Sequence, residues 1–460
     1  MSRSNGRVFY GYYLAAFAFS LGFISGCVYL YSRGVFVRDQ IIDFDASRTE
    51  ISLVFTAVQI VSTWFAPVLG YLLDKYPIRN VMLAGAVSLV VGFLAMSQAQ
   101  NLIQFTVLAA IFLGFGIGCV GTTANTKLMV NWFNRRRGLA LGIAIMGYSA
   151  AGTVMSPIAL FMLNNLGWRT SYVLFAAICL FVVLPAIALL VKQRPQDIGV
   201  GPDGDPYQPP PEEPRSPEQK LADRPLAGLA LGQGGWQRRW RALKAQLAVY
   251  VAFARSVPFW GVVFTFGLMA GTFGGFNVHL FLYYTELGID EYRATLILSF
   301  TSGLAIASKP MFGWLIDNVN PRTATLVSCG CYTIAMVCFS FFSSFALLFL
   351  AGALFGLGFG GMVPVRAAIL SRLFSTDEYA RAYGSLRLCM FPMTVTWTPL
   401  IGYIYDTSGS YAPAFKLFAV LFTAAAAIAW FLIPARIEEP LLGERSPLSS
   451  PATHPAETRG

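Results

Sequence analysis

The stretch SKPMFGWLIDNVNPR, residues 308–322, holds two signals that decide the fold of this chain. The first is Lys309, a charge about seven residues before the end of an apolar run and therefore about 10 Å inside a hydrocarbon layer of about 30 Å. The second is a pattern of Gly, Leu, Asp and Arg that also occurs 243 residues earlier, in GYLLDKYPIR. The matching positions are Gly313, Leu315, Asp317 and Arg322 in one copy and Gly70, Leu72, Asp74 and Arg79 in the other. These signals predict a duplicated membrane protein.

The composition agrees with a membrane location. Hydrophobic residues make up 56% of the 460 positions and charged residues only 12%, which is more apolar surface than a water-soluble globule tolerates. Apolar runs of about 20 to 28 residues are long enough to cross a bilayer as helices. The predicted fold is an all-α polytopic membrane protein with twelve transmembrane helices in two pseudo-symmetric six-helix halves. The runs lie near residues 12–32, 50–73, 80–98, 102–128, 139–163, 170–191, 258–284, 293–316, 323–343, 345–370, 383–405 and 412–433.

Basic residues predict the orientation. When the helices alternate, both termini and the segment 192–257 fall on the same side as the cluster Arg135, Arg136 and Arg137. Cytoplasmic loops carry an excess of Lys and Arg, so this side is predicted to be the cytoplasm. The net charge of +10 is therefore attributed to topology and not to nucleic-acid binding. We expect a multi-pass protein of the plasma membrane, with a bacterial inner membrane the favoured case.

Four parts are expected along the chain. Residues 1–191 form the N-terminal six-helix half and residues 258–434 the C-terminal half. Between them lies the cytoplasmic linker 192–257, which is rich in Pro, Glu, Asp, Gly and Ser from Pro195 to about Gly235 and is predicted to be disordered there. Within it, 236–253 is read either as an interfacial helix or as a charged solvated face. The tail 435–460 is polar and predicted to be a disordered cytoplasmic tail.

The repeat has one register along the chain. The matched pairs are Pro67 and Pro310 at a separation of 243, and Gly142 and Gly384, Pro157 and Pro399, and GFGIG (114–118) and GLGFG (356–360) at a separation of 242. GFGIG lies within an apolar helix, where it indicates close helix packing and not a nucleotide-binding loop. The chain contains no G-x-x-x-x-G-K-[ST] loop, and all seven cysteines lie in predicted spans. We therefore expect no cofactor and no metal.

Both copies of the motif, GYLLDKYPIR and GWLIDNVNPR, resemble the signature between helices 2 and 3 of the major facilitator superfamily. Three further stretches are similar to its monocarboxylate-porter and oxalate/formate-antiporter branch. They are WFNRRRGLALGIAIMGYSAAG at 132–152, NVHLFLYYTELGI at 277–289 and IGYIYDTSGSYAPAF at 401–415. The resemblance covers nearly the whole chain and implies a transporter, not an enzyme.

The resemblance also implies a conformational latch. In the superfamily the Asp of the motif caps a helix of the other half, and its Arg supports this contact, which holds the cytoplasmic side shut while the protein faces outward. A carboxylate at a helix N-terminus gains about 0.3–1 kcal/mol from the helix dipole, so such a contact can break and re-form in each cycle. The residues that take this role by resemblance are Gly70, Asp74, Arg79, Gly313, Asp317 and Arg322.

Basic residues within the predicted helices of the second half have no Asp or Glu at comparable depth. Lys309, Arg366 and Arg387 each align with an apolar residue in the first half, so a scaffold role shared by both halves does not explain them. Lys309 is the deepest and is the leading candidate for substrate binding. Arg366 and Arg387 are candidates too, with snorkelling to lipid headgroups as the alternative. His279 is a further candidate, with a hydrogen bond between packed helices as the alternative.

Other polar and aromatic residues are assigned around this group. Tyr31 and Trp397 are predicted to supply an apolar wall and hydrogen-bond donors, with helix packing as the alternative. Arg33 and Lys127 lie near predicted helix ends and are expected to snorkel or to line the rim of a cavity. The segment NGRVFYGYY at the first helix lacks the acidic-glycine pair common in monocarboxylate transporters. This difference argues against proton symport and leaves anion exchange open.

Unpaired cations in a water-filled cavity between the halves prefer an anion, and a small carboxylate is the simplest one. We therefore predict a secondary active transporter of a small organic anion, a mono- or dicarboxylate, that works by alternating access. Two alternatives remain: an exporter of amphipathic or drug-like compounds, which would favour a buried carboxylate, and a transporter-derived receptor, which would need a folded appended domain. We expect a monomer in the lipid bilayer, driven by protons or a counter-anion.

Overall fold

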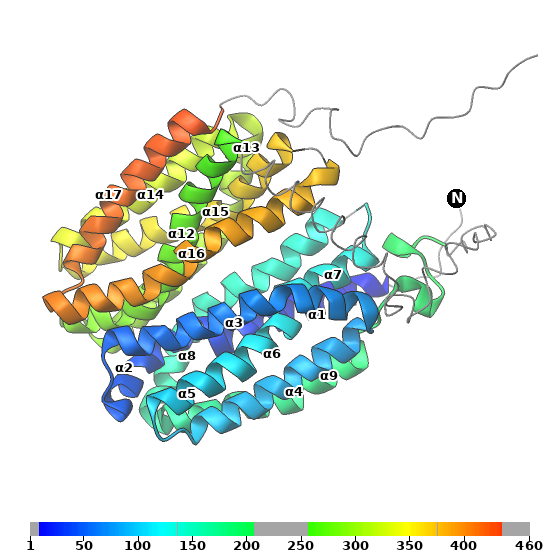
Figure 1. Cartoon of the computed structure of the whole chain (residues 1–460), viewed down its shortest axis with the longest axis horizontal. Helices are drawn as coiled ribbons and strands as arrows, with labels where there is room; N and C mark the ends of the chain where they lie inside the picture. The colour runs from blue at the N-terminus through cyan, green and yellow to red at the C-terminus, as the bar shows by residue number, and fades with distance from the viewer. Residues whose placement is uncertain (1–8, 136, 207–255, 375, 435–460) are drawn as a thin grey trace, which may run out of the picture.

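The computed structural model describes residues 9–135, 137–206, 256–374 and 376–434. Regular structure in these ranges is helical apart from one isolated β-bridge between Val200 and Pro206. The helices form two bundles that lie side by side, one built from α1 to α9 and the other from α12 to α17 (Figure 1). The segment 236–253 and the tail 435–460 lie outside the described residues.

The first bundle contains six crossings. The first crossing passes through α1 (Tyr10–Ser25), the π-helical segment η1 (Gly26–Tyr31) and α2 (Arg33–Phe44). The second and third are α3 (Arg48–Lys75) and α4 (Ile78–Ser97). The fourth comprises α5 (Leu102–Leu108), η2 (Ala109–Leu113), α6 (Gly114–Val120) and α7 (Thr122–Trp132). The fifth and sixth comprise α8 (Arg137–Ile178), η3 (Cys179–Val183) and α9 (Leu184–Leu190), with the turn between them at Gly167, where φ is 73°.

The second bundle has one helix for each crossing: α12 (Val257–Glu286), α13 (Glu291–Asn318), α14 (Pro321–Phe341), α15 (Phe345–Leu373), α16 (Thr376–Ser408) and α17 (Ala412–Leu432). Ten helical stretches of the described chain have the length and hydropathy of a membrane span. One of them, Leu139–Leu190, holds two crossings, and α16 adds another although its hydropathy is lower. The predicted twelve-helix fold is confirmed.

Local sequence explains where several helices begin. The side chain of Ser47 accepts a hydrogen bond from the backbone N–H of Glu50, and the Glu50 carboxylate accepts one from the backbone N–H of Ser47, which together form a capping box at α3. Asn320 caps α14 by accepting from the backbone N–H of Thr323 at 2.7 Å. These caps satisfy N–H groups that a helix leaves unpaired at its start.

The stretch GLGFG on α15, the repeat copy of GFGIG, packs closely against a neighbouring helix. A Cβ at Gly356 would collide with the backbone carbonyl of Thr301 on α13. Without a side chain at this position, the two helix backbones can approach each other closely. The same contact fixes α13, the helix that carries Lys309, against α15 within the second bundle.

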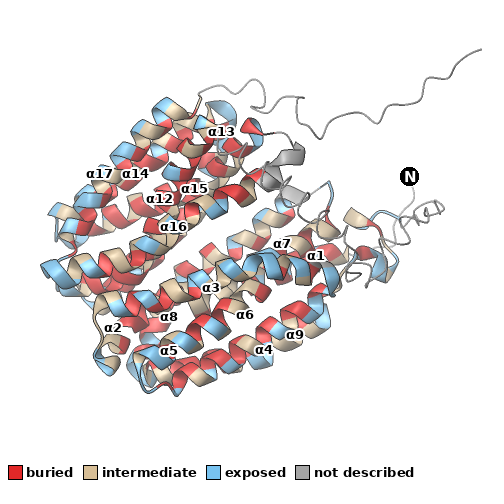
Figure 2. Cartoon of the chain, in the orientation of Figure 1, coloured by how far each residue is buried: buried red, intermediate tan, exposed pale blue. Residues whose placement is uncertain are grey.

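Burial follows the faces on which helices meet, and exposed residues cover the outer surface (Figure 2). Many exposed residues are large and apolar; Ile103, Leu189 and Phe431 are 77%, 77% and 80% exposed. In water such a surface would drive association, whereas hydrocarbon chains solvate it. The outer surface is therefore one that a bilayer covers.

The first helix is longer than the apolar run predicted. We expected it to end at residue 32, but helical structure continues as α2 to Phe44. The sequence becomes amphipathic there, and the apolar side chains of Val35, Phe36 and Val37 are fully buried. Tertiary packing stabilises a helical segment whose mean hydropathy alone would end it.

The beginning of the predicted linker is ordered, which corrects the expectation of disorder from residue 195. The short helices η4 (Pro195–Ile198) and η5 (Pro202–Gly204) precede residue 207. The Asp203 carboxylate accepts hydrogen bonds from the backbone N–H groups of Asn134 and Arg135 at 2.9 and 2.7 Å. The aspartate thus ties this segment to the turn between α7 and α8.

The two bundles meet along three pairs of helices. Helix α8 packs against α13, α3 against α16, and α2 against α12. These contacts pair the fifth crossing with the eighth and the second with the eleventh. Side chains that point between these pairs lie between the halves and not toward lipid.

The orientation gives a first testable prediction. A cysteine placed at Asp43, in the last turn of α2, should react with a membrane-impermeant thiol reagent added outside intact cells, because this end is predicted to be extracellular. A cysteine at Ser216 in the linker should react only after the cells are opened. Labelling with the opposite sidedness would reverse the topology.

Candidate functional site

Lys309 lies at the interface between the halves. Its Nζ donates a hydrogen bond to the hydroxyl of Ser149 on α8, at 2.6 Å. Because α8 belongs to the first half and α13 to the second, this contact crosses between them. None of the ion pairs formed by the described residues includes Lys309. A cation at this depth thus has a neutral partner, which leaves its charge available to an anion.

A narrow cavity lies further along the same interface. Its lining combines Tyr31, Gly34 and Ser156 from the first half with Phe273, Asn277, Leu280, Leu298, Thr301, Ser302 and Phe355 from the second. Ser302 is two helical turns from Lys309 on α13, about 10 Å along the helix axis. Hydroxyl and amide groups inside an otherwise apolar wall are typical of a small-molecule site.

Tyr31, a predicted site residue, lies in this cavity. Its side chain is buried, and its ring lies beside Gly152 of α8, as does the hydroxyl of Ser302. A Cβ at Gly152 would collide with both, so the glycine makes room for this contact. The structure therefore brings Tyr31 to the same interface as Lys309.

Arg366 and Arg387 are not among the residues that line this cavity. Arg366 is buried, where it donates to the Tyr383 hydroxyl at 3.1 Å and approaches the sulfur of Met390 at 3.9 Å. Both neighbours belong to α16, so this arginine joins α15 to α16. Arg387 is exposed on α16. Lys309 does not line the cavity either, but it differs from Arg366 because its partner Ser149 lies across the interface.

His279 forms hydrogen bonds between packed helices. Its Nε2 lies 3.0 Å from the Ser52 hydroxyl and 3.2 Å from the Thr398 carbonyl, and its Nδ1 lies 3.3 Å from the Tyr411 hydroxyl. Ser52 belongs to the first half, so the buried imidazole connects the two halves. This arrangement matches the alternative interpretation of His279, a packing hydrogen bond.

Trp397 packs within the second half. Its ring meets Phe418 edge-on, with centroids 5.1 Å apart, and it lies against Gly271 of α12. Its Nε1 is buried and has no hydrogen-bond partner in the described structure. A tryptophan N–H in an apolar setting usually finds an acceptor, so this donor is available for one.

Sequence reasoning missed a set of contacts that closes the interface on the predicted extracellular side. We call it the outer closure and define it by Arg38, Arg48, Thr49 and Asn164 of the first half and Glu286, Glu291, Asp406 and Tyr411 of the second. Arg38 forms an ion pair with Glu291, and Arg48 forms one with Glu286. The Arg48 guanidinium also lies over the Tyr405 ring, 3.5 Å from its centroid. Every ion pair between the halves among the described residues belongs to this set.

Asp406 holds the start of α3 from the opposite half. Its carboxylate accepts from the backbone N–H groups of Arg48 and Thr49 at 3.1 and 2.8 Å, and from the Thr49 hydroxyl at 2.5 Å. Carboxylates at a helix N-terminus are favoured by the unpaired N–H groups and the dipole. In the repeat register Asp406 corresponds to Asn164, which donates to Glu291 at the start of α13 at 3.4 Å. The duplication therefore yields two related contacts. The repeat register that aligns Asp406 with Asn164 was already present in the sequence.

The latch positions on the predicted cytoplasmic side do not bridge the halves in the described structure. Arg79 and Asp317 are exposed, and Gly70 and Gly313 face open space. The Arg322 guanidinium lies over the Trp430 ring, 4.3 Å from its centroid, within the second half. The side chain of Asp74 lies outside what the structure describes.

Lys127 acts within the first half. Its Nζ donates to the backbone carbonyl of Leu73 at 2.6 Å, at the end of α3. The last carbonyls of a helix lack internal donors, and a cation there also complements the helix dipole. This contact replaces the expected snorkelling toward lipid.

In this conformation the outer closure is formed, and the latch residues Arg79 and Asp317 are exposed. The resemblance implies that the contact of Asp74 forms in the state that faces outward. The prediction for Asp74→Asn follows from this cycle. The substitution should slow transport several-fold while membrane abundance stays near normal, because the carboxylate stabilises one conformation and not the fold. Initial uptake rates normalised to protein amount check this, with exposed Asp317→Asn as the matched change in the second copy. A parallel fall in abundance and uptake would instead indicate a structural role.

Comparison with known proteins agrees with this fold. The family model of the Major Facilitator Superfamily matches residues 8–346 and 333–456. The chain therefore belongs to the Major Facilitator Superfamily, a class of non-enzymatic membrane transporters.

Individual relatives are more distant. Monocarboxylate transporter 11 of Homo sapiens is 26% identical over 417 residues, which cover 89% of this chain and 80% of the relative. Monocarboxylate transporter 13 of Rattus norvegicus is 24% identical over 392 residues, with coverage of 84% and 80%. The crystal structure of a D-xylose-proton symporter superposes with a TM-score of 0.68 at 13% identity, covering 93% of this chain and 99% of the symporter. The structural likeness concerns the fold alone.

Proposed function

We propose that this transporter carries a small organic anion, a mono- or dicarboxylate, by alternating access of its two halves to the two sides of the membrane. The observation that carries the proposal is Lys309, a cation between the halves whose hydrogen-bond partner is the neutral Ser149. A substrate carboxylate would supply the missing negative charge. The relatives named monocarboxylate transporters support the same class of substrate.

The cavity further along the interface from Lys309 supports a small substrate. Tyr31, Ser302 and Asn277 offer hydroxyl and amide groups, while Phe273 and Phe355 offer apolar surface. Because both halves contribute to the lining, rocking one half against the other would expose the site to one side at a time. The outer closure would then represent the state that faces the cytoplasm.

We also propose a membrane location, a topology and an oligomeric state. We place the protein in the plasma membrane with both termini in the cytoplasm, and we propose that a single chain transports, because each chain contains both halves of the site. Protons and a counter-anion remain alternative driving ions.

Uptake into proteoliposomes tests the proposed function. Labelled mono- and dicarboxylates should accumulate, whereas the neutral amides of the same carbon skeletons should not. Imposed pH, voltage and counter-substrate gradients, varied one at a time, would identify the driving ion. Uptake of a neutral sugar, a nucleoside or a cationic amphiphile without uptake of any carboxylate would contradict the proposal.

A further inference from the structure

Arg33 lies deep in the protein, which its predicted position at a helix end did not indicate. It is the first residue of α2, directly after the π-helical segment and Ser32, and about 16 Å along the helix from the end at Phe44. Segments of π-helix inside longer helices often occur at functional sites because they change the direction in which side chains point. The continuous helix thus places a guanidinium inside the membrane-spanning region.

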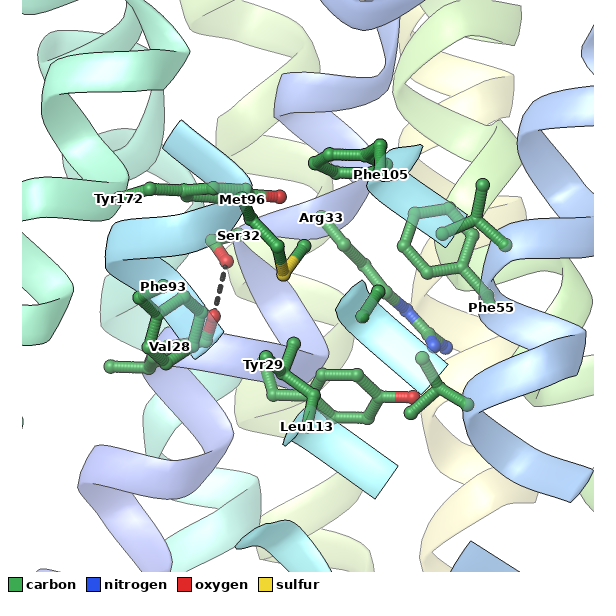
Figure 3. Close-up of a pocket in the computed structure, with 13 residues that line it drawn as sticks. Val28, Tyr29, Ser32, Arg33, Phe55, Phe93, Met96, Phe105, Leu113 and Tyr172 are labelled. Carbon is green, nitrogen blue, oxygen red and sulfur yellow. Dashed lines mark hydrogen bonds between the residues drawn. The ribbon is translucent and has the colours of Figure 1, made fainter. Parts of the chain in front are cut away.

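The surroundings of Arg33 are mainly apolar and aromatic. The guanidinium carbon lies 5.1 Å from the centroid of the Phe55 ring and 5.4 Å from that of Tyr29. Figure 3 shows a close-up of the pocket that Arg33 lines. In this view the guanidinium lies on the side of Phe55 and the Tyr29 hydroxyl, away from Phe93. Aromatic faces stabilise a cation but do not accept its N–H groups, and the neutral Tyr29 hydroxyl adds one hydrogen-bonding contact.

The hydrogen bonds of Arg33 are incomplete. One terminal nitrogen donates to the backbone carbonyl of Gly274 at 3.3 Å, and Nε is buried with no partner. Gly274 belongs to α12, so Arg33 reaches across to the second half. None of the ion pairs among the described residues involves Arg33. Burying a cation among neutral partners costs free energy. A side chain that only donated a hydrogen bond to one carbonyl would not need to carry a charge.

Arg33 and Lys309 lie on opposite halves, and both reach the interface between the halves. Tyr31, two residues before Arg33, meets Gly152 of α8 beside Ser302. Ser149, which binds Lys309, precedes Gly152 by three residues, or about 4.5 Å along α8. Each cation also reaches toward the other half, Arg33 to α12 and Lys309 to α8. The interface therefore carries two positive charges, one contributed by each half.

We propose that Arg33 is a substrate-binding residue that recognises a second negative charge, and that the substrate is a short dicarboxylate held between Arg33 and Lys309. This inference rests on the proposed anion transport and narrows its substrate class. A planar guanidinium can bind a carboxylate through two parallel N–H donors, and its orphaned Nε supplies one of them. The Tyr29 ring, within cation–π distance of the guanidinium, adds a hydroxyl on the same side.

The test compares a four-carbon dicarboxylate with its monoamide, which has the same skeleton and one charge fewer. Competition against labelled substrate should show that the intact protein binds the dicarboxylate at least about tenfold more tightly, the size expected for one hydrogen-bonded charged group. Arg33→Gln should remove most of this preference by weakening the dicarboxylate and leaving the monoamide nearly unchanged. Arg33→Lys should retain part of it, because the charge remains while the paired donor geometry is lost.

Matched variants separate the possible explanations. Arg38→Gln removes the same charge from the same helix, but at the outer closure, and should leave the preference between the two ligands intact. Lys309→Gln should weaken both ligands. If Arg33→Gln does not fold, as judged by its elution as a single species in detergent, Arg33→Lys alone still decides, because an unchanged preference there would overturn the proposal.

Two outcomes would overturn the role of Arg33 and leave the proposed anion transport in place. In the first, Arg33→Gln weakens the binding of both ligands equally. In the second, the intact protein shows no preference for the dicarboxylate, while Lys309→Gln still weakens the binding of both ligands. Failure of the intact protein to bind either ligand or any other carboxylate would remove the proposed function as well. The two failures are therefore distinguishable.

Discussion

Lys309→Gln is expected to abolish substrate binding or to raise the half-saturation concentration by at least tenfold. Its charge costs about 2.5–3.5 kcal/mol near a helix centre, and the structure offers it only the neutral hydroxyl of Ser149. A substrate carboxylate would recover that free energy, and glutamine cannot form the same charge-assisted contact. Lys309→Arg should keep part of the activity, because the charge remains but its geometry changes.

The measurement is initial uptake of carboxylates into proteoliposomes over a range of concentrations. Lys416→Gln is the matched control, because it removes the same charge from an exposed position beside Phe341 and should transport normally. Equal half-saturation in the intact protein and in Lys309→Gln, for every anion transported, would exclude Lys309 from the binding site.

Arg48→Glu is expected to open the predicted extracellular side and to reduce transport. Arg48 pairs with Glu286, donates to the Tyr411 hydroxyl and lies over the Tyr405 ring, and its side chain is only 15% exposed. A hydrogen bond to a charged group contributes about 1.5–3 kcal/mol when it is protected from water, and about 1.4 kcal/mol is a tenfold change in a conformational equilibrium. The reversed charge would also lie close to Asp406, which adds repulsion.

Accessibility of the cavity checks this prediction. A single cysteine at Asn277, in a chain whose seven native cysteines are replaced, should react about tenfold faster with an impermeant thiol reagent from outside once Arg48→Glu is added. Adding Glu286→Arg should restore part of the protection, because the pair re-forms with its charges exchanged. Arg293→Glu is the control, since Arg293 lies on the same side against Phe345 of its own half. An unchanged labelling rate in Arg48→Glu would show that the outer closure does not hold the interface.

Lys309 and Arg33 show how far local sequence can locate a site. Lys309 was identified because a charge interrupts a long apolar run, and hydropathy records such an interruption directly. Arg33 was placed at a helix end because the apolar run stops at residue 32, whereas the helix continues through η1 and α2. A charge that follows an apolar run can meet either lipid headgroups or the opposite half of the protein. For Arg33 the packing of α2 against α12 decides, and a short stretch of sequence around Arg33 does not include α12.

His279 and Arg366 show a limit of the same reasoning. Both were selected because polar groups at depth are costly, and both are buried with protein partners. The sequence identified the need for a partner but not its identity. Ser52 is 227 residues from His279, and Tyr383 is 17 residues from Arg366 on the next helix, so only the packed fold shows that each polar group is at least partly satisfied.

The sequence by itself determined the number of crossings, their approximate limits and the relation of the two halves, because hydropathy, caps and a repeat of constant offset are local or periodic properties of the chain. Tertiary structure alone decided which charges face each other. Asp406 holds the start of α3 from 358 residues away, and Arg48 pairs with Glu286 across 238 residues. Electrostatic contacts act over a few ångströms of space and not along the chain, so their partners become known only when the two halves are packed together.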